Sequence, residues 1–124
     1  MSLAFWCVLI AGLLPFVATV TAKAGGARFN NRDPRSWLAK QEGFRKRANN
    51  AQSNSFEAFP LFAAGVIVAT LAKAPQTAID MTALFFIGMR VVYLVCYLAD
   101  WHWLRSLVWF FGLGACVRLF LLGA

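Results

Sequence analysis

The stretch ANNAQSNSFEAFPLFAAGVIVATLA, residues Ala48–Ala72, passes from a polar half into an apolar half without a loop between them. The second half is apolar enough to enter a lipid bilayer. The first half carries a carboxylate, Glu57, and several amides toward the membrane. Ionisable groups inside a membrane are costly, and they face the protein interior or a ligand rather than lipid. The stretch therefore predicts a membrane-spanning helix with one polar side.

The composition of the whole chain is typical of a membrane protein. Of its 124 residues, 60% are hydrophobic and 14% are charged, whereas a soluble domain carries roughly 25% charged residues. Four apolar runs each approach the ~20 residues that cross a bilayer. We therefore predict an all-α fold, an integral membrane four-helix bundle that forms a single domain over residues 1–124. Its expected spans are residues 3–22, 47–71, 79–98 and 103–122, and a basic segment covers residues 23–46.

Positive charge is concentrated in one part of the chain. Eight of the twelve Lys and Arg residues lie between Lys23 and Arg47. Cytoplasmic loops of membrane proteins are enriched in such residues, and anionic lipid headgroups are their natural counter-charge. The distribution predicts that loop 23–46 is cytoplasmic and that both termini lie on the opposite side. It also accounts for the net charge of +7 without a nucleic acid partner, for which the sequence has no motif.

The N-terminal apolar run resembles a signal peptide only in part. Small residues follow it at Thr21, Ala22 and Ala24, as at a cleavage site. However, no positive residue precedes the run, and its length is greater than that of the apolar region of a signal peptide. We expect it to be retained as the first span, with a kink at Pro15.

The basic segment carries signals for a short helix of its own. Asp33 is a good N-cap, Pro34 suits the first helical position, and Gly43 suits a C-terminal stop. We expect Trp37 and Leu38 to face the bilayer, so that this helix lies at the membrane interface. The alternative is one continuous helix from Pro34 into the second span.

Two of the expected spans have one polar face each. The residues of each face are spaced by three, four and three positions, which keeps them within about 80° of one another at ~100° per residue. Because consecutive spans run antiparallel, we expect Glu57 and Arg90 to lie at the same depth, about 15 Å below the basic end. Their opposite charges predict that they approach each other, directly or through a ligand. The faces consist of Arg47, Asn50, Asn54 and Glu57 in the second span and of Arg90, Tyr93, Tyr97 and Asp100 in the third.

Two interpretations of these faces stay open. They can join helices within a bundle through hydrogen bonds, or they can bind a ligand. Periodicity alone does not identify that ligand. The remaining polar or reactive residues have simpler interpretations: Cys7, Cys96 and Cys116 as small buried residues without metal or disulfide spacing, Trp109 as a lipid-facing or packing residue, His102 as an interfacial residue, and Arg118 as a cation that reaches the far surface.

Three motifs together resemble the MAPEG family, the membrane-associated proteins in eicosanoid and glutathione metabolism. RANNAQSNSFEAFPLF (47–62) resembles the second-helix pattern R-A-x-x-N-x-x-E-x-x-P. RVVYLVCYL (90–98) resembles the third-helix R-x-x-Y-x-x-x-Y, and LRSLVW (104–109) resembles the Arg-Ser pair that opens the fourth helix. The resemblance extends over about the whole chain. The matching residues are Ala51, Asn54, Glu57, Phe59, Pro60, Arg90, Tyr93, Tyr97, Arg105 and Ser106.

The resemblance implies a homotrimer that binds glutathione between neighbouring subunits near the cytoplasmic side. Arg105 matches the Arg proposed to stabilise the glutathione thiolate and is the candidate catalytic residue. A nearby cation lets a thiol ionise at neutral pH, and the thiolate is the nucleophile. The implied function is a membrane glutathione transferase or peroxidase that acts on lipophilic electrophiles, with glutathione as cosubstrate. The expected glutathione-binding residues are Arg47, Asn54, Glu57, Arg90, Tyr93 and Tyr97.

The chain departs from the family pattern at two positions. Asn50 stands where the family has an Arg seven residues before the Glu, and Arg47 lies one helical turn away. Ala58 follows Glu57 where leukotriene-type members often have an aromatic residue, which argues against an eicosanoid-specific function. Two other functions therefore stay open: a non-enzymatic lipid-binding or scaffold protein of the same family, and a small transporter or channel.

Overall fold

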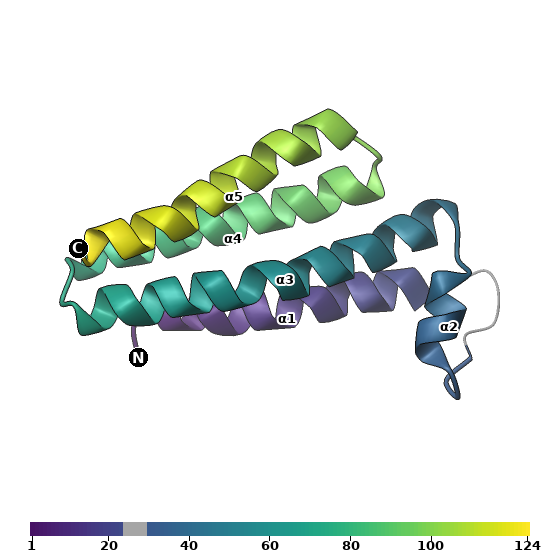
Figure 1. Cartoon of the computed structure of the whole chain (residues 1–124), viewed down its shortest axis with the longest axis horizontal. Coiled ribbons are helices and arrows are strands. Elements are labelled where there is room, and N and C mark those ends of the chain that lie inside the picture. The colour runs from purple at the N-terminus through teal and green to yellow at the C-terminus, as the bar shows by residue number, and fades with distance from the viewer. Residues whose placement is uncertain (24–29) are drawn as a thin grey trace.

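The computed structural model describes residues 1–23 and 30–124 and consists of helices joined by turns (Figure 1). No strand occurs in these two ranges, and the prediction of an all-α fold is confirmed. In chain order the helices are α1 (Leu3–Lys23), α2 (Pro34–Ala39), α3 (Gly43–Leu71), α4 (Gln76–Leu98) and α5 (His102–Leu122).

Two of the long helices, α3 and α4, begin several residues before the expected spans. α3 begins at Gly43 rather than at residue 47, and α4 begins at Gln76 rather than at residue 79. Hydropathy marks the part of a helix that lies in hydrocarbon, whereas a helix continues through polar residues beyond it. The polar first turns of α3 and α4 therefore extend the bundle past its apolar zone.

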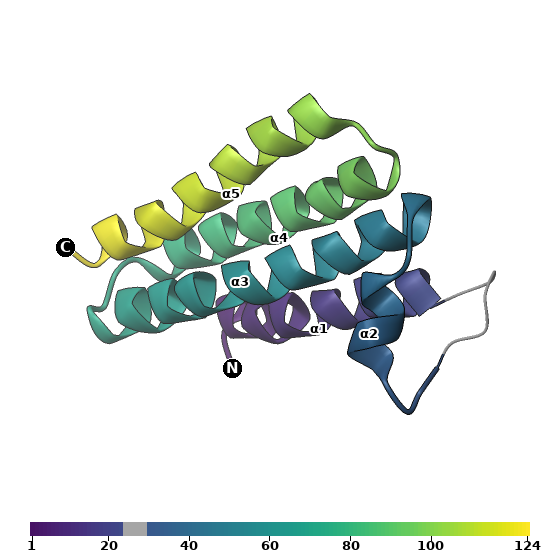
Figure 2. The ribbon, with the colours of Figure 1, turned by 45° about the vertical axis from the view of Figure 1, so that its right-hand side comes forward.

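The four long helices lie side by side and alternate in direction along the chain (Figures 1 and 2). α1 packs on α3 and α4, and α5 packs on α4 and α3. The N-terminus, the α3–α4 turn and the C-terminus lie at one end of the bundle, and α2 and the α4–α5 turn lie at the other end. This arrangement brings the polar part of α3 next to α4, as expected for consecutive antiparallel spans.

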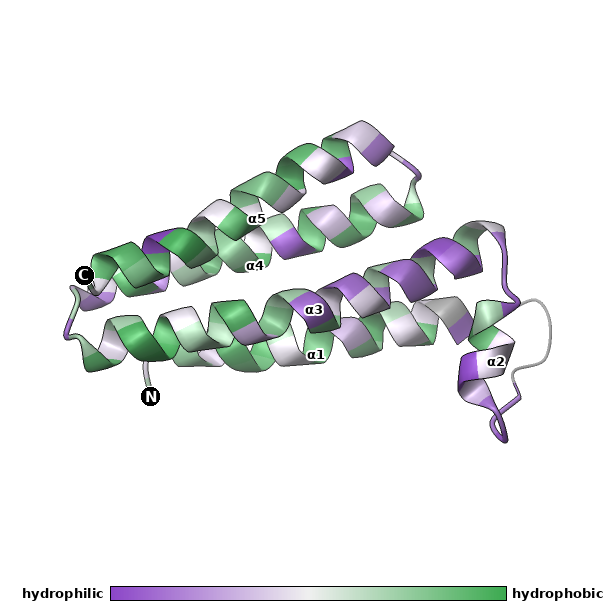
Figure 3. Cartoon of the chain, viewed as in Figure 1, coloured by the Kyte–Doolittle hydropathy of each residue, from purple (hydrophilic) through white to green (hydrophobic). Residues whose placement is uncertain are grey.

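The surface of the bundle is mostly apolar. Each of the four long helices is long and apolar enough to cross a membrane, and only 22% to 33% of the most apolar stretch of each is buried. Figure 3 shows hydrophilic residues gathered on α2 and on the N-terminal half of α3. The chain is therefore an integral, multi-pass membrane protein.

In the core, α3 packs on α4 through an aromatic stack and on α5 through a close contact at a glycine. Phe62 of α3 stacks on Phe86 of α4 with ring centroids 4.0 Å apart. Gly65 lets α3 approach α5, because a Cβ atom there would lie 3.0 Å from Cβ of Leu119. Both contacts hold α3 against the α4–α5 pair at the depth where the candidate site begins.

α3 and α4 end in the same way. Each helix is followed by a residue in the left-handed region, Lys73 (φ 57°) and Asp100 (φ 62°). This conformation turns the chain so that the next N–H closes back on the last helical turn, which is the Schellman motif. The closing hydrogen bonds run from the N–H of Ala74 to the carbonyl of Ala69 (3.1 Å) and from the N–H of Trp101 to the carbonyl of Cys96 (2.8 Å).

The basic segment forms a short helix, α2, that is separate from α3, so the alternative of one continuous helix is wrong. Asp33 caps α2 as expected, because its side chain accepts a hydrogen bond from the N–H of Ser36 (3.4 Å). Gly43 does not end α2. It begins α3 with φ 60°, a conformation that turns the chain between the two helices and that favours glycine.

The expectation that Leu38 of α2 faces the bilayer is wrong. Leu38 is buried and packs with Ala48 of α3 and Leu98 of α4. α2 therefore covers the polar end of the bundle, and burial of Leu38 there removes its apolar surface from water. Residues 24–29 of the basic segment lie outside the described residues.

Candidate functional site

A buried cation lies between α3 and α4 at the centre of the candidate site. The side chain of Arg90 is 6% exposed. Its Nη2 donates hydrogen bonds to Oδ1 of Asn54 (2.8 Å) and to Oγ of Ser55 (3.4 Å). Its guanidinium carbon also lies 4.2 Å from the centre of the Tyr93 ring. Arg90 is therefore held by an amide, a hydroxyl and an aromatic face, all of which are neutral.

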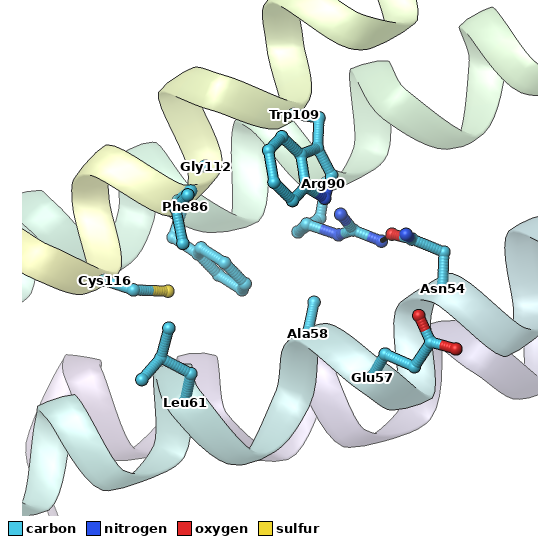
Figure 4. Close-up of a pocket in the computed structure, with 10 residues that line it drawn as sticks. Asn54, Glu57, Ala58, Leu61, Phe86, Arg90, Trp109, Gly112 and Cys116 are labelled. Atoms are coloured by element: carbon cyan, nitrogen blue, oxygen red, sulfur yellow. Dashed lines mark hydrogen bonds between the residues drawn. The ribbon is translucent and has the colours of Figure 1, made fainter.

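Glu57 does not pair directly with Arg90. Both residues line the same cavity, but no ion pair joins them, and the Glu57 side chain is exposed (Figure 4). Of the two expected ways of approach, directly or through a ligand, the direct one is absent, and Asn54, one turn earlier on α3, contacts Arg90 instead. The physical reason is that an amide is buried at lower cost than a carboxylate. Glu57 remains free to pair with a ligand that enters the cavity.

The cavity next to Arg90 has a volume of about 180 Å³ and lies between α3, α4 and α5. One end is polar, with Asn54, Glu57 and Arg90, and the rest of the wall is mainly apolar (Figure 4). Such a cavity suits a small ligand that has a charged group at one end. The other lining residues are Ala58, Leu61, Phe86, Trp109, Gly112, Leu113 and Cys116.

A row of aromatic rings connects Arg90 to Arg105. The rings of Tyr93 and Tyr97 meet edge to face, with centroids 5.6 Å apart. The guanidinium carbon of Arg105, on α5, lies 4.4 Å from the centre of the Tyr97 ring. Cations are attracted to aromatic faces. The structure therefore brings together Arg90, Tyr93, Tyr97 and Arg105, four of the residues that the sequence singled out.

Arg47 is placed differently from the other candidates. It does not line the cavity next to Arg90, and its Nε and Nη2 donate to the carbonyl oxygen of Leu98 (3.4 and 3.3 Å). The last carbonyls of a helix have no partner within the helix, so Arg47 satisfies one of them at the end of α4. Asn50, at the position of the family Arg, is exposed.

The contribution of α5 to the cavity was missed in the sequence. The sequence predicts a lipid-facing or packing role for Trp109 and a small buried side chain for Cys116, yet both line the cavity. A signal was present, because Arg105, Trp109, Gly112 and Cys116 are spaced by four, three and four residues. This spacing places all four on one face of a helix. The pattern is a weak signal of a site, because Arg105 is the only charged residue among the four.

Comparison with protein families gives a match over nearly the whole length of the chain. The model of the MAPEG family matches residues 3–124. Comparison with curated proteins and with solved structures finds no significant match.

Proposed function

Because the chain belongs to the MAPEG family, we propose that it is a membrane glutathione transferase or peroxidase that acts on lipophilic electrophiles. Members of this family generally use glutathione. The observation that carries the proposal is the buried Arg90, whose contacts are all neutral. A buried charge without a counter-ion is costly, and an anionic ligand group in the adjoining cavity would compensate it.

Glutathione matches the charges around the cavity. One of its carboxylates can accept hydrogen bonds from the remaining donors of Arg90, which present a planar fork suited to carboxylates. Its ammonium group can pair with Glu57, which is exposed beside the same cavity. Asn54, Tyr93 and Tyr97 then position the peptide. Arg47 supports this site indirectly, because its hydrogen bonds hold the end of α4, the helix that carries Arg90.

Arg105 is the proposed catalytic residue. Its guanidinium is positively charged and can favour the thiolate of bound glutathione. In conjugation, the thiolate sulfur forms a bond to the electrophilic carbon of a lipophilic acceptor, and the leaving group departs with the electron pair. In peroxide reduction, the thiolate sulfur forms a bond to the terminal peroxide oxygen as the O–O bond breaks, and the alkoxide leaves and takes up a proton to become an alcohol. The sulfenic acid formed on glutathione then reacts with a second glutathione, which gives glutathione disulfide and water. The lipophilic substrate reaches the site from the bilayer.

The proposed assembly is a homotrimer with glutathione bound at subunit interfaces. The wide apolar surface of the four long helices supports contacts with lipid and with further copies. A neighbouring subunit would also enlarge the site, since a cavity of about 180 Å³ is below the ~300 Å³ of common ligand pockets. In the proposed orientation, segment 23–46 is cytoplasmic and both termini lie on the opposite side.

A second candidate function is a non-enzymatic lipid-binding or scaffold protein. The observation in its favour is that Asn50 replaces the family Arg, while two donors of Arg47 are engaged by Leu98. The two functions differ in whether bound thiol turns over.

The test is calorimetric titration of glutathione into the detergent-solubilised protein, followed by a thiolate absorbance assay and by turnover of a lipophilic electrophile. The enzyme proposal expects binding, thiolate absorbance and turnover, all weakened in Arg90→Met. Binding without turnover supports the scaffold function. A protein that binds no thiol at millimolar concentration contradicts the enzyme proposal.

A further inference from the structure

A second hollow lies on the outer surface of α4 and α5, at the end of the bundle that carries the C-terminus. It has a volume of about 360 Å³ and shares no lining residue with the cavity beside Arg90. Its walls include Phe85 of α4 and Phe110 and Phe111 of α5. Thr82 and Arg118 line it as well, and they are its hydrogen-bonding residues.

The guanidinium of Arg118 is held by one hydrogen bond and makes only part of the hydrogen bonds that it can donate. Its Nε donates to Oγ1 of Thr82 (3.0 Å), and this hydroxyl donates to the carbonyl of Ala78 (2.7 Å). Arg has five N–H donors, and the Nη atoms of Arg118 have no partner within the described part of the chain. No ion pair joins Arg118 to Asp80, whose Oδ1 accepts hydrogen bonds from the N–H of Ala4 (2.9 Å) and from Nε2 of Gln76 (2.8 Å).

The position of this cation along α5 matches a membrane interface. Arg118 lies four residues before the last residue of α5, Leu122, which is about 6 Å of helix. Phe110 lies eight residues further into the bundle, about 12 Å deeper. The groove therefore has a charge near headgroup level and aromatic walls that continue toward the bilayer centre. This is the arrangement of charge and apolar surface in an anionic phospholipid.

Gly114 keeps the groove open. It lines the groove, and a Cβ atom at this position would meet nothing within 4 Å. A larger side chain here can fill the groove without displacing the core. Gly88, on the exposed side of α4, is equally open and does not line the groove. The two glycines therefore form a matched pair for an experiment.

We propose that this α4–α5 groove binds an anionic phospholipid of the leaflet at the C-terminal end of the bundle. The Nη donors of Arg118 contact the phosphate, for which guanidinium is well suited. One acyl chain lies along the groove against Phe110 and against the rings of Phe85 and Phe111, which meet edge to face with centroids 6.5 Å apart. The bound lipid supplies the counter-charge that the described residues do not provide, and it stabilises the α4–α5 pair.

The experiment is native mass spectrometry of the purified oligomer with phosphatidylglycerol, phosphatidylcholine of the same acyl chains, or oleate. We expect the wild type to retain phosphatidylglycerol about fivefold more strongly than phosphatidylcholine, as one basic residue at a membrane surface provides. Arg118→Gln should abolish this preference. Gly114→Leu should reduce binding of both phospholipids, while Gly88→Leu should leave it unchanged.

Several outcomes would overturn the proposal. Equal retention of the two phospholipids by the wild type contradicts the role of charge. Binding by Gly114→Leu at the wild-type level contradicts the location, and this variant keeps the test valid if Arg118→Gln fails to fold. Displacement of phosphatidylglycerol by oleate at equal concentration identifies a fatty-acid site instead. A wild type without bound phospholipid, together with a changed oligomer mass in Gly114→Leu, shows that a second copy fills the groove.

Discussion

Arg90 of α4 donates a 2.8 Å hydrogen bond from Nη2 to Oδ1 of Asn54 on α3, so a neutral amide rather than a carboxylate holds the buried cation. Hydrogen bonds to charged groups contribute about 1.5–3 kcal/mol. We therefore expect Asn54→Ala to lower the free energy of unfolding by this amount, measured by denaturation of the detergent-solubilised protein. Glu57→Gln, at an exposed side chain, should change it by less than about 0.5 kcal/mol.

A double-mutant cycle separates this bond from general packing. Asn54→Ala and Arg90→Met should be coupled, because each removes the same contact. Glu57→Gln and Arg90→Met should be additive in the absence of thiol. Strong coupling between Glu57 and Arg90 in the ligand-free protein would show that the carboxylate, and not the amide, is the partner.

The close approach of α3 and α5 at Gly65 predicts sensitivity to a single methyl group. In Gly65→Ala the new Cβ would lie 3.0 Å from Cβ of Leu119, and such overpacking costs about 1–3 kcal/mol. Gly88→Ala is the control, because its Cβ meets nothing within 4 Å. It should stabilise the helix by up to about 1 kcal/mol. Equal effects of the two changes on the melting temperature would contradict the packing of α3 on α5.

The two left-handed turns predict stabilising substitutions. Lys73 and Asp100 adopt φ values of 57° and 62°, a conformation that costs a residue with a Cβ about 1–2 kcal/mol. Lys73→Gly and Asp100→Gly should therefore each raise the melting temperature. Ala72→Gly is the control, because Ala72 has φ −78° and gains nothing from glycine. A lower melting temperature in both turn variants would rule out these helix ends.

The proposed orientation predicts where an added cysteine is labelled. Ser36 on α2 is exposed, and the three native cysteines are buried. A membrane-impermeant maleimide should label Ser36→Cys only from the cytoplasmic side. Lys73→Cys, in the exposed turn at the other end of the bundle, should be labelled only from the opposite side. Reversal of the two patterns would mean that the positive charge does not set the orientation.

The helices and two polar faces could be predicted from the sequence because apolar length and residue spacing are local properties. The depth match between Glu57 and Arg90 was also predictable, and both line one cavity. The hydrogen-bond partner was not, because the rotation of α3 decides whether Asn54 or Glu57 points at α4. The conformation of Gly43 was equally ambiguous, since a glycine with positive φ can end one helix or begin the next.

The part of the site that α5 provides depends on how separate helices pack against one another. Trp109 and Cys116 line the cavity because α5 presents one face to both α3 and α4. Their spacing is that of any buried helix face. Only the contact of Arg105 with Tyr97 distinguishes this face, and a contact between two spans cannot be obtained from the periodicity of either one.

The contact of Arg105 with Tyr97 is the basis of the last prediction. The guanidinium carbon of Arg105 lies 4.4 Å from the ring centre of Tyr97, near the start of α5 and the α4–α5 turn. A soluble thiol can reach this end of the bundle from water, and a lipophilic acceptor can reach it from the bilayer. Tyr97 therefore holds the cation at the place where, in the proposed function, the thiol and the lipophilic acceptor would meet.

If Arg105 stabilises a thiolate, Arg105→Ala should raise the pKa of bound glutathione, because the charge that favours its ionised form is lost. Turnover should fall about 10²-fold, as for removal of one group that stabilises a developing anion, while glutathione affinity and assembly change much less. Arg105→Lys should restore part of the thiolate absorbance. Arg35→Ala removes an equal charge from the exposed surface of α2 and should leave the thiol unaffected. A variant Arg105→Ala that inserts or folds poorly, with the thiol pKa unchanged in the folded fraction, would show that Arg105 is a membrane anchor and not the catalytic residue.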